Sequence, residues 1–145
     1  MTQTKTPKYL FLLAMLFLLP ALLVACAKQP ETKLAPLDQM SEQVKSAPVK
    51  VQQAYQFAIA NPHIMGQIPC YCGCGKMGHT SNYACYASGV DANGKVIFDT
   101  HALGCSICVD ITQDTMRLLK EGKSIPEIKA YVDQTYTRYG PSNMP

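Results

Sequence analysis

Hydrophobic residues recur at helical spacing in three segments of the chain. The first segment lies between Pro48 and Asn61, where Val51, Tyr55 and Ala58 fall on one face. Proline is tolerated at a helix start, and the Asn-Pro pair after the last of these positions is typical of a helix end. The pattern therefore predicts a helix over roughly residues 48–61.

The other two helical segments are adjacent and lie near the C-terminus. One begins at about Gly104 and ends at Gly122. Its buried stripe is predicted to be Ile107, Cys108, Ile111, Thr115, Leu118 and Leu119. The next begins at Ser124, which forms a capping box with Glu127, and ends at Gly140. Its predicted core positions are Ile128, Tyr131, Val132 and Tyr136. Because the turn between them is short, we expect an antiparallel helix hairpin.

Residues 62–100 have little periodicity and many turn formers. The Asn93-Gly94 pair favours the positive backbone angles of a tight turn. We predict at most one short β-hairpin, Tyr83–Ser88 against Lys95–Asp99. A loop region of this length in a small domain needs metal or disulfide bonds to hold it. The predicted fold is a mainly α, small cysteine-rich domain with a C-terminal antiparallel helix hairpin.

The N-terminus has the features of an export signal. Lys5 and Lys8 precede an apolar stretch, Tyr9–Leu22, and Leu23-Val24-Ala25-Cys26 resembles the lipobox of bacterial lipoproteins. The stretch is short for a spanning helix, although an uncleaved membrane anchor is the alternative. We predict that residues 1–25 are a lipoprotein signal peptide and that Cys26 is lipidated. The protein would then be anchored outside the cytoplasmic membrane, or at the outer membrane of a cell that has one.

Composition and charge limit the classes of function. We predict that residues 26–47, which are polar and proline-bearing, form a flexible tether, and that residues 48–145 form the domain. About 120 residues remain after the signal, enough for one small domain. Loss of the two lysines takes the formal charge from +3 to +1. So small a charge, without a basic cluster, argues against nucleic acid.

Six cysteines remain for chemistry, and three of them lie in one glycine-broken run. Cys70, Cys72 and Cys74 are two residues apart and cannot pair comfortably with one another. Thiolates are soft donors that select Cu(I), Zn(II) or iron–sulfur clusters. Cys105 and Cys108 would share a face at a helix start, where the helix dipole favours an ionised thiol. With Cys85 they could complete a metal site.

Two histidines are further candidate ligands. His79 and His101 flank the two cysteine groups, where an imidazole could bind metal or hydrogen-bond to sulfur. Zinc sites commonly use four ligands, whereas Cu(I) uses fewer and shares thiolates between ions, so six thiols favour Cu(I) over Zn(II). The alternative is three structural disulfides, since six is an even number and exported proteins meet oxidising conditions.

The segment Pro69–Cys74, with Asp99–Ile111, resembles bacterial lipoproteins named after their PCYCGC motif. The resemblance covers most of the mature chain. It groups the six cysteines without implying a reaction, because the family has no assigned activity. Separately, Glu121–Ile128, with Tyr131 and Tyr139-Gly140, is similar to the helix pair of the thiol-reducing subunit of cytochrome c maturation.

These features predict a lipid-anchored protein that binds a soft metal ion, for metal binding, delivery or resistance. Its partners would be the membrane, the metal and a metal-exchange or redox protein. One alternative is a thiol–disulfide oxidoreductase that uses Cys105 and Cys108. Another is an interaction module that zinc or disulfides hold in shape. No catalytic residue is predicted for the metal-binding function, and no serine or carboxylate pair stands beside a histidine as in a hydrolase.

Overall fold

The computed structural model describes residues 32–144, which are mainly helical, as predicted. The helices are α2 (Glu42–Lys45), α3 (Val49–Ala60), α4 (Pro62–Met65), α5 (His101–Gly104), α6 (Ser106–Lys120) and α7 (Ile125–Tyr136). Single turns of 3₁₀ helix are η2 (Leu37–Gln39), η3 (Cys74–Met77), η4 (Tyr83–Cys85) and η5 (Thr137–Tyr139). One antiparallel hairpin, β1 (Ala87–Val90) with β2 (Val96–Phe98), completes these elements.

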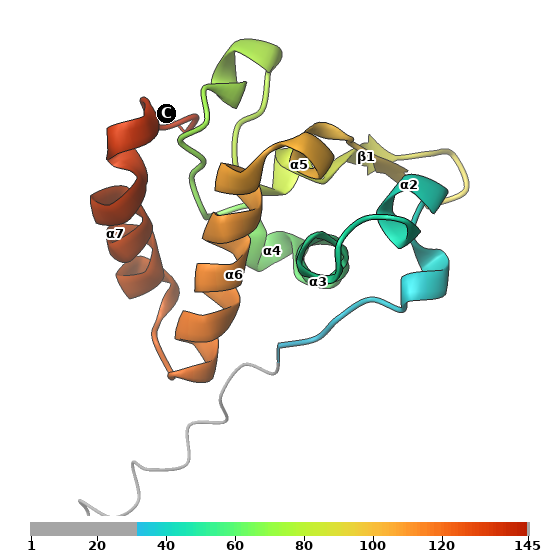
Figure 1. Cartoon of the computed structure of the whole chain (residues 1–145), viewed down its shortest axis with the longest axis horizontal. Helices are drawn as coiled ribbons and strands as arrows, with labels where there is room; N and C mark the ends of the chain where they lie inside the picture. Colours follow the sequence, from blue (N-terminus) through green and yellow to red (C-terminus); the bar gives the residue numbers. More distant parts are fainter. Residues whose placement is uncertain (1–31, 145) are drawn as a thin grey trace, which may run out of the picture.

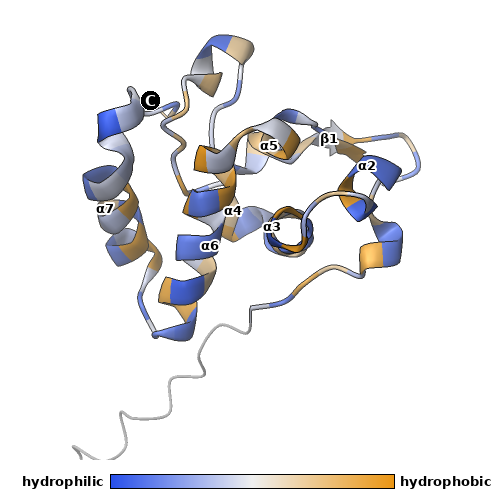
Figure 2. Cartoon of the chain, in the orientation of Figure 1, coloured by the Kyte–Doolittle hydropathy of each residue, from blue (hydrophilic) through white to orange (hydrophobic). Residues whose placement is uncertain are grey.

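The three long helices are those that the hydrophobic spacing predicts. Helix α6 packs against both α3 and α7, and Figure 1 shows α6 and α7 as the expected antiparallel pair. Figure 2 shows hydrophobic and hydrophilic residues alternating round these two helices, as their sequence period requires. None of the helices within residues 32–144 is long and apolar enough to span a bilayer.

The capping box at the start of α7 is present. The Glu127 carboxylate accepts hydrogen bonds from the backbone N–H of Ser124, at 2.8 Å, and from its hydroxyl, at 2.7 Å. Lys123 adds an ion pair at 3.3 Å. These hydrogen bonds, followed by the ion pair, lower the pKa of Glu127 to about 2. The capping box therefore places the turn after α6 and fixes where α7 begins.

Glu127→Gln is expected to destabilise the protein in a pH-dependent way. A carboxylate with a lowered folded pKa contributes its full stability above its unfolded pKa of about 4.3, and loses it as pH falls toward about 2. The melting temperatures of wild type and variant should therefore differ at neutral pH and converge near pH 2. A difference that stays constant over this range would contradict the assignment.

The β-hairpin turns at Gly94, as predicted. Its first strand, Ala87–Val90, begins and ends later than the predicted Tyr83–Ser88, whereas its second, Val96–Phe98, lies within the predicted Lys95–Asp99. Gly94 has φ +78°, a conformation that residues with a Cβ rarely adopt. The Asp91 carboxylate accepts from the backbone N–H groups of Asn93 and Lys95 and closes the turn. The pairing is irregular between Ala87 and Gly89, which makes the hairpin short.

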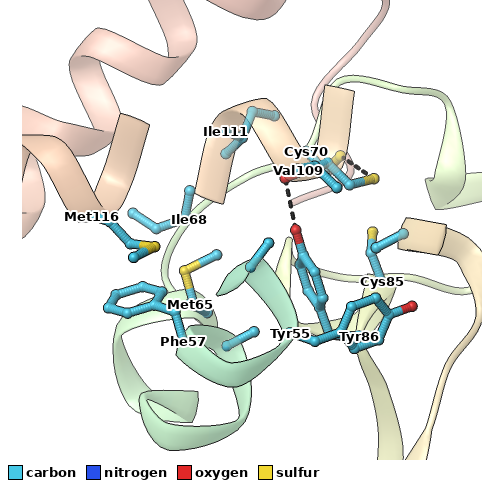
Figure 3. Packing of buried hydrophobic residues seen from close by; sticks show 14 of the residues in the cluster. Tyr55, Phe57, Met65, Ile68, Cys70, Cys85, Tyr86, Val109, Ile111 and Met116 are labelled. Atoms are coloured by element: carbon cyan, nitrogen blue, oxygen red, sulfur yellow. Dashed lines mark hydrogen bonds between the residues drawn. The ribbon is translucent and has the colours of Figure 1, made fainter. Parts of the chain in front are cut away.

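The core lies between α3, α6, α7 and the segment that follows α4. Tyr55, Phe57, Met65, Ile68 and Tyr86 are fully buried there. In Figure 3 Cys70 and Cys85 lie at one end of this cluster, and Phe57 and Met116 lie at the other. The cysteine-rich segment is thus continuous with the hydrophobic core.

The prediction of a flexible tether is wrong for the described part of residues 26–47. Met40 and Val44 are buried, and the Ala35 N–H donates to the Gln56 carbonyl at 2.9 Å. Only Val44 lies in α2, a single helical turn that is too short to give a detectable period, and Met40 lies between η2 and α2. The predicted signal, residues 1–25, and Cys26 lie outside the described residues.

Candidate metal centre

Glycine shapes the loop that carries the three-cysteine run. Gly73 and Gly78 have φ values of +84° and +86° and stand immediately before and after η3. These left-handed conformations turn the chain back on itself within a few residues. Downstream, the Asn82 N–H donates to the Ile68 carbonyl at 2.7 Å. Cys70, Cys72 and Cys74 are therefore held on a closed loop.

The second group of ligands comes from α5 and the start of α6. His101 is the first residue of α5, and its backbone N–H donates to Asp99 Oδ1 at 2.8 Å. Cys105 is the N-cap residue of α6, and Cys108 lies in the first turn of that helix. This sharp junction of two helices points the two cysteines and His101 toward the loop.

All six predicted cysteines and His101 converge. Cys70 Sγ lies 3.4 Å from both Cys72 Sγ and Cys108 Sγ, which are 3.6 Å from each other. Cys74 Sγ and Cys85 Sγ are 3.6 Å apart. His101 Nε2 is 3.3 Å from Cys72 Sγ. The two helix-borne sulfurs thus join those of the loop, as the metal hypothesis requires.

The structure contains four sets of side chains in which the donor atoms of each set all lie within 4.8 Å of one another. They are Cys72 with His101, Cys105 and Cys108; Cys70 with Cys72 and Cys74; Cys70 with Cys85 and Cys108; and Cys74 with Cys85 and His101. The cysteines and His101 could therefore hold a metal ion.

The sulfur spacing fits a shared ion better than a disulfide. A disulfide bond is about 2.05 Å long, and within residues 32–144 every cysteine is free. Four sulfurs held about 2.3 Å from a tetrahedral ion lie roughly 3.8 Å apart. The separations of 3.4 to 3.6 Å are close to this value. The three predicted alternative disulfides are absent from this part of the chain.

Burial divides the cluster into a closed side and an open side. Cys70, Cys85 and Cys108 are 0 % exposed and Cys74 is 1 % exposed. Cys72, Cys105 and His101 are only half-buried. An ion could therefore enter on the side of Cys72 and Cys105 while the remaining sulfurs stay screened from solvent.

Hydrogen bonding within the cluster favours ionisation of Cys70 over that of its neighbours. The hydrogen bond from Cys108 is the main cause that lowers the pKa of Cys70 to about 2. The same hydrogen bond raises the pKa of Cys108, so the expected acidity from the helix dipole does not appear there. Burial, followed by the charge of Cys70, raises the pKa of Cys72. Binding of a metal ion would therefore release protons from these thiols.

His79 stands beside the cluster without joining any of the converging sets. Its Nε2 lies 3.4 Å from Asp99 Oδ2, and its ring meets that of His101 edge to face, with centroids 5.3 Å apart. Its Nδ1 is buried and has no hydrogen-bond partner. Since Asp99 also accepts from the His101 N–H, these contacts position His101. Direct ligation by His79 stays a prediction.

Sequence reasoning missed the polar residues that hold the ligands in place. Asn143, in the C-terminal tail, accepts from the Cys70 N–H at 2.7 Å and donates through Nδ2 to Cys74 Sγ at 3.5 Å. Its backbone N–H also donates to the Cys70 carbonyl. Figure 1 shows the C-terminal end beside this loop. The contact joins residues 73 apart in sequence, so no local pattern reveals it.

A second missed group supports Cys108. The Tyr86 hydroxyl donates to the Cys108 carbonyl at 2.9 Å, and Asn82 Nδ2 donates to the same oxygen at 3.4 Å. Tyr86 and Asn82 are fully buried. Buried polar groups with these partners fix the first turn of α6 against the residues that flank η4.

Asn143→Ala is expected to destabilise the protein by about 1–3 kcal/mol, because the buried N–H of Cys70 loses its acceptor. Urea denaturation of the metal-free protein would measure the change in unfolding free energy. Ser142→Ala is the matched control, since Ser142 is exposed and its hydrogen bonds with Met144 stay within the tail. Equal stabilities for the two variants would show that the tail does not fasten the loop.

Comparison with known proteins gives one match. A family model, described as a protein of unknown function with a PCYCGC motif, matches residues 22–145. Searches of the curated proteins and of the solved structures find no match. The similarity of the C-terminal helices to the thiol-reducing subunit of cytochrome c maturation is therefore not confirmed. The family model spans the loop, the hairpin and all three long helices, so the chain belongs to the family of proteins of unknown function that share the PCYCGC motif.

Proposed function

We propose that this protein is an exported, lipid-anchored protein that binds a soft metal ion, with Cu(I) preferred over Zn(II), for metal binding, delivery or resistance. The observation that supports this function most is the convergence of six free thiols and one imidazole from four parts of the chain. Thiols buried at such close spacing are costly to arrange without a common partner, and a thiophilic cation is a suitable one.

The preference for Cu(I) follows from the number and kind of donors. Zinc in a structural site takes four ligands, and Cys72, His101, Cys105 and Cys108 form such a set. Three buried sulfurs would remain beside that ion. Thiolate-only sets of three suit Cu(I), which is soft and accepts low coordination numbers. Inductively coupled plasma analysis of protein produced and purified anaerobically would test the preference for Cu(I) over Zn(II). A protein saturated with zinc and free of copper would reverse this preference.

The proposed location rests on the N-terminal sequence. Lys5, Lys8, the apolar stretch Tyr9–Leu22 and Cys26 carry the features of a lipoprotein signal. Because lipidation at one cysteine anchors a protein, the metal centre would face the extracytoplasmic side.

Cys26→Ser is expected to abolish attachment of lipid. The wild-type protein should partition into detergent and carry the mass of a diacylglycerol on residue 26, because the lipobox cysteine is the acceptor. The variant should retain the mass of residues 1–25 and lack the lipid, as intact-mass spectrometry of membrane extracts would show. A variant that still carries the mass of the lipid would show that Cys26 is not the lipidated residue.

Thiol–disulfide exchange is the second candidate, and the partial exposure of Cys105 favours it. In this case the Cys105 thiolate attacks a substrate disulfide, the substrate's leaving sulfur departs as a thiol, and Cys108 resolves the mixed disulfide. The oxidised pair requires an external thiol reductant for the next cycle. Rapid, selective alkylation of Cys105 near neutral pH, with Cys70, Cys72 and Cys74 unreactive, would favour exchange. Protection of all six thiols by bound Cu(I) would favour the metal centre.

A further inference from the structure

The seven converging donors divide into two complete ligand sets. Cys105 belongs to a single one of the four sets, together with Cys72, His101 and Cys108. An ion bound by Cys105 can be held by these four donors, three sulfurs and one imidazole nitrogen. This set, here called the outer set, contains the three half-buried residues of the cluster and one buried sulfur.

The three remaining sulfurs form a set of their own. Cys70 and Cys74 lie within 4.8 Å of each other, as do Cys70 and Cys85, and Cys74 and Cys85. All three are at most 1 % exposed. We call Cys70, Cys74 and Cys85 the inner set. It offers three sulfurs and no oxygen or nitrogen ligand, the donor type and number that suit Cu(I).

The two sets touch through Cys70. Its sulfur lies 3.4 Å from Cys72 Sγ and 3.4 Å from Cys108 Sγ, which both belong to the outer set. A thiolate at this position is near enough to serve both sets, and Cu(I) ions readily share thiolates. A single ion bound by the outer set would use four of the seven donors. The three buried sulfurs of the inner set would then remain without a metal.

From this division we infer that the protein binds two Cu(I) ions in a thiolate-bridged centre, with Cys70 as the bridge. This inference rests on the proposed metal-binding function and adds its stoichiometry. The inner ion is coordinated by Cys70, Cys74 and Cys85 and is screened from solvent. The outer ion is coordinated by Cys72, His101, Cys105 and Cys108 at the open side of the cluster, and it is the ion that exchanges with a partner.

The experiment is a Cu(I) titration of the intact protein in detergent, reduced and anaerobic, followed by native mass spectrometry. Wild type should take up two copper ions and then saturate. Cys105→Ser should saturate at one ion, because the inner set is intact. The half-buried position of Cys105 makes serine tolerable there, and circular dichroism of the apo variant checks its fold. Cys85→Ser, which removes an inner ligand, should also saturate at one ion.

The outcomes separate the two proposals. Saturation of wild type at one copper ion, or at three or more, would overturn the two-ion centre while leaving the metal-binding function in place. Binding of no copper, together with no zinc in a parallel titration, would overturn both. If Cys105→Ser still binds two ions, or binds none while folded, the division into outer and inner sets is wrong. A Ser106→Ala variant, changed at an exposed position of the same helix turn, should bind two ions as wild type does.

Discussion

Cys70→Ser is expected to weaken Cu(I) binding more than any other single substitution in the cluster. Cys70 belongs to the inner set and its Sγ also contacts two sulfurs of the outer set, so its loss removes a ligand from one ion and a shared donor from the other. Loss of a residue that only orients a metal ligand lowers the affinity by up to roughly 100-fold. Because Cys70 is itself a ligand, we expect a larger loss of affinity. Competition against a chromophoric Cu(I) chelator would measure it.

The controls separate loss of a ligand from damage to the loop. Lys76 lies on the same loop with an exposed side chain, so Lys76→Ala should bind Cu(I) as wild type does. His79→Ala tests the supporting histidine and should weaken binding by roughly 10–100-fold, as a group that orients a ligand does. An affinity of Cys70→Ser within tenfold of that of Lys76→Ala would contradict the assigned role of Cys70.

Metal binding is expected to produce a large rise in thermal stability. A ligand at about 1,000 times its dissociation constant stabilises the folded state by about 4 kcal/mol. For a domain of this size that corresponds to a melting-temperature rise on the order of 15 °C or more. Differential scanning calorimetry of the copper-loaded and chelator-treated protein, both reduced, would measure it. A rise below about 2 °C would show that the loop is held without the metal.

The same stabilisation should fall as pH falls. Cys72, Cys74 and Cys108 have raised pKa values, through burial for the first two and hydrogen bonding to Cys70 for the last. Protons therefore compete with the metal for these sulfurs, and the competition strengthens toward acid pH. The difference in melting temperature between loaded and metal-free protein should be largest at neutral to alkaline pH and shrink on acidification. A difference that grows on acidification would contradict binding through thiolates.

The elements whose residues contact one another locally could be predicted from the sequence. Helix α6 carries eight buried residues on one face, so its period is long enough to detect. The bond between Ser124 and Glu127 spans three residues and has a recognisable motif. The packing of Met40 and Val44 on the domain could not be predicted, because two apolar positions in a polar segment do not define a face.

The candidate site could be predicted in part for the same reason. The spacing of Cys70, Cys72 and Cys74 predicts a site for a soft ion, and the structure brings Cys105 and Cys108 to the same cluster, which could hold a metal ion. The groups that orient these ligands come from distant segments: Asn143 from the tail and Asp99 from the residue after the hairpin. Polar residues of this kind occur throughout the sequence, and only tertiary contact gives them a role.

In the proposed function the six thiols share bound metal and are not paired in disulfides. Intact-mass spectrometry of anaerobically purified protein, under native conditions and then after denaturation with alkylation, tests it most directly. We expect bound copper in the native spectrum and, after denaturation, six alkylated cysteines: Cys70, Cys72, Cys74, Cys85, Cys105 and Cys108. A metal-free protein with three disulfides and no alkylated cysteine would contradict it.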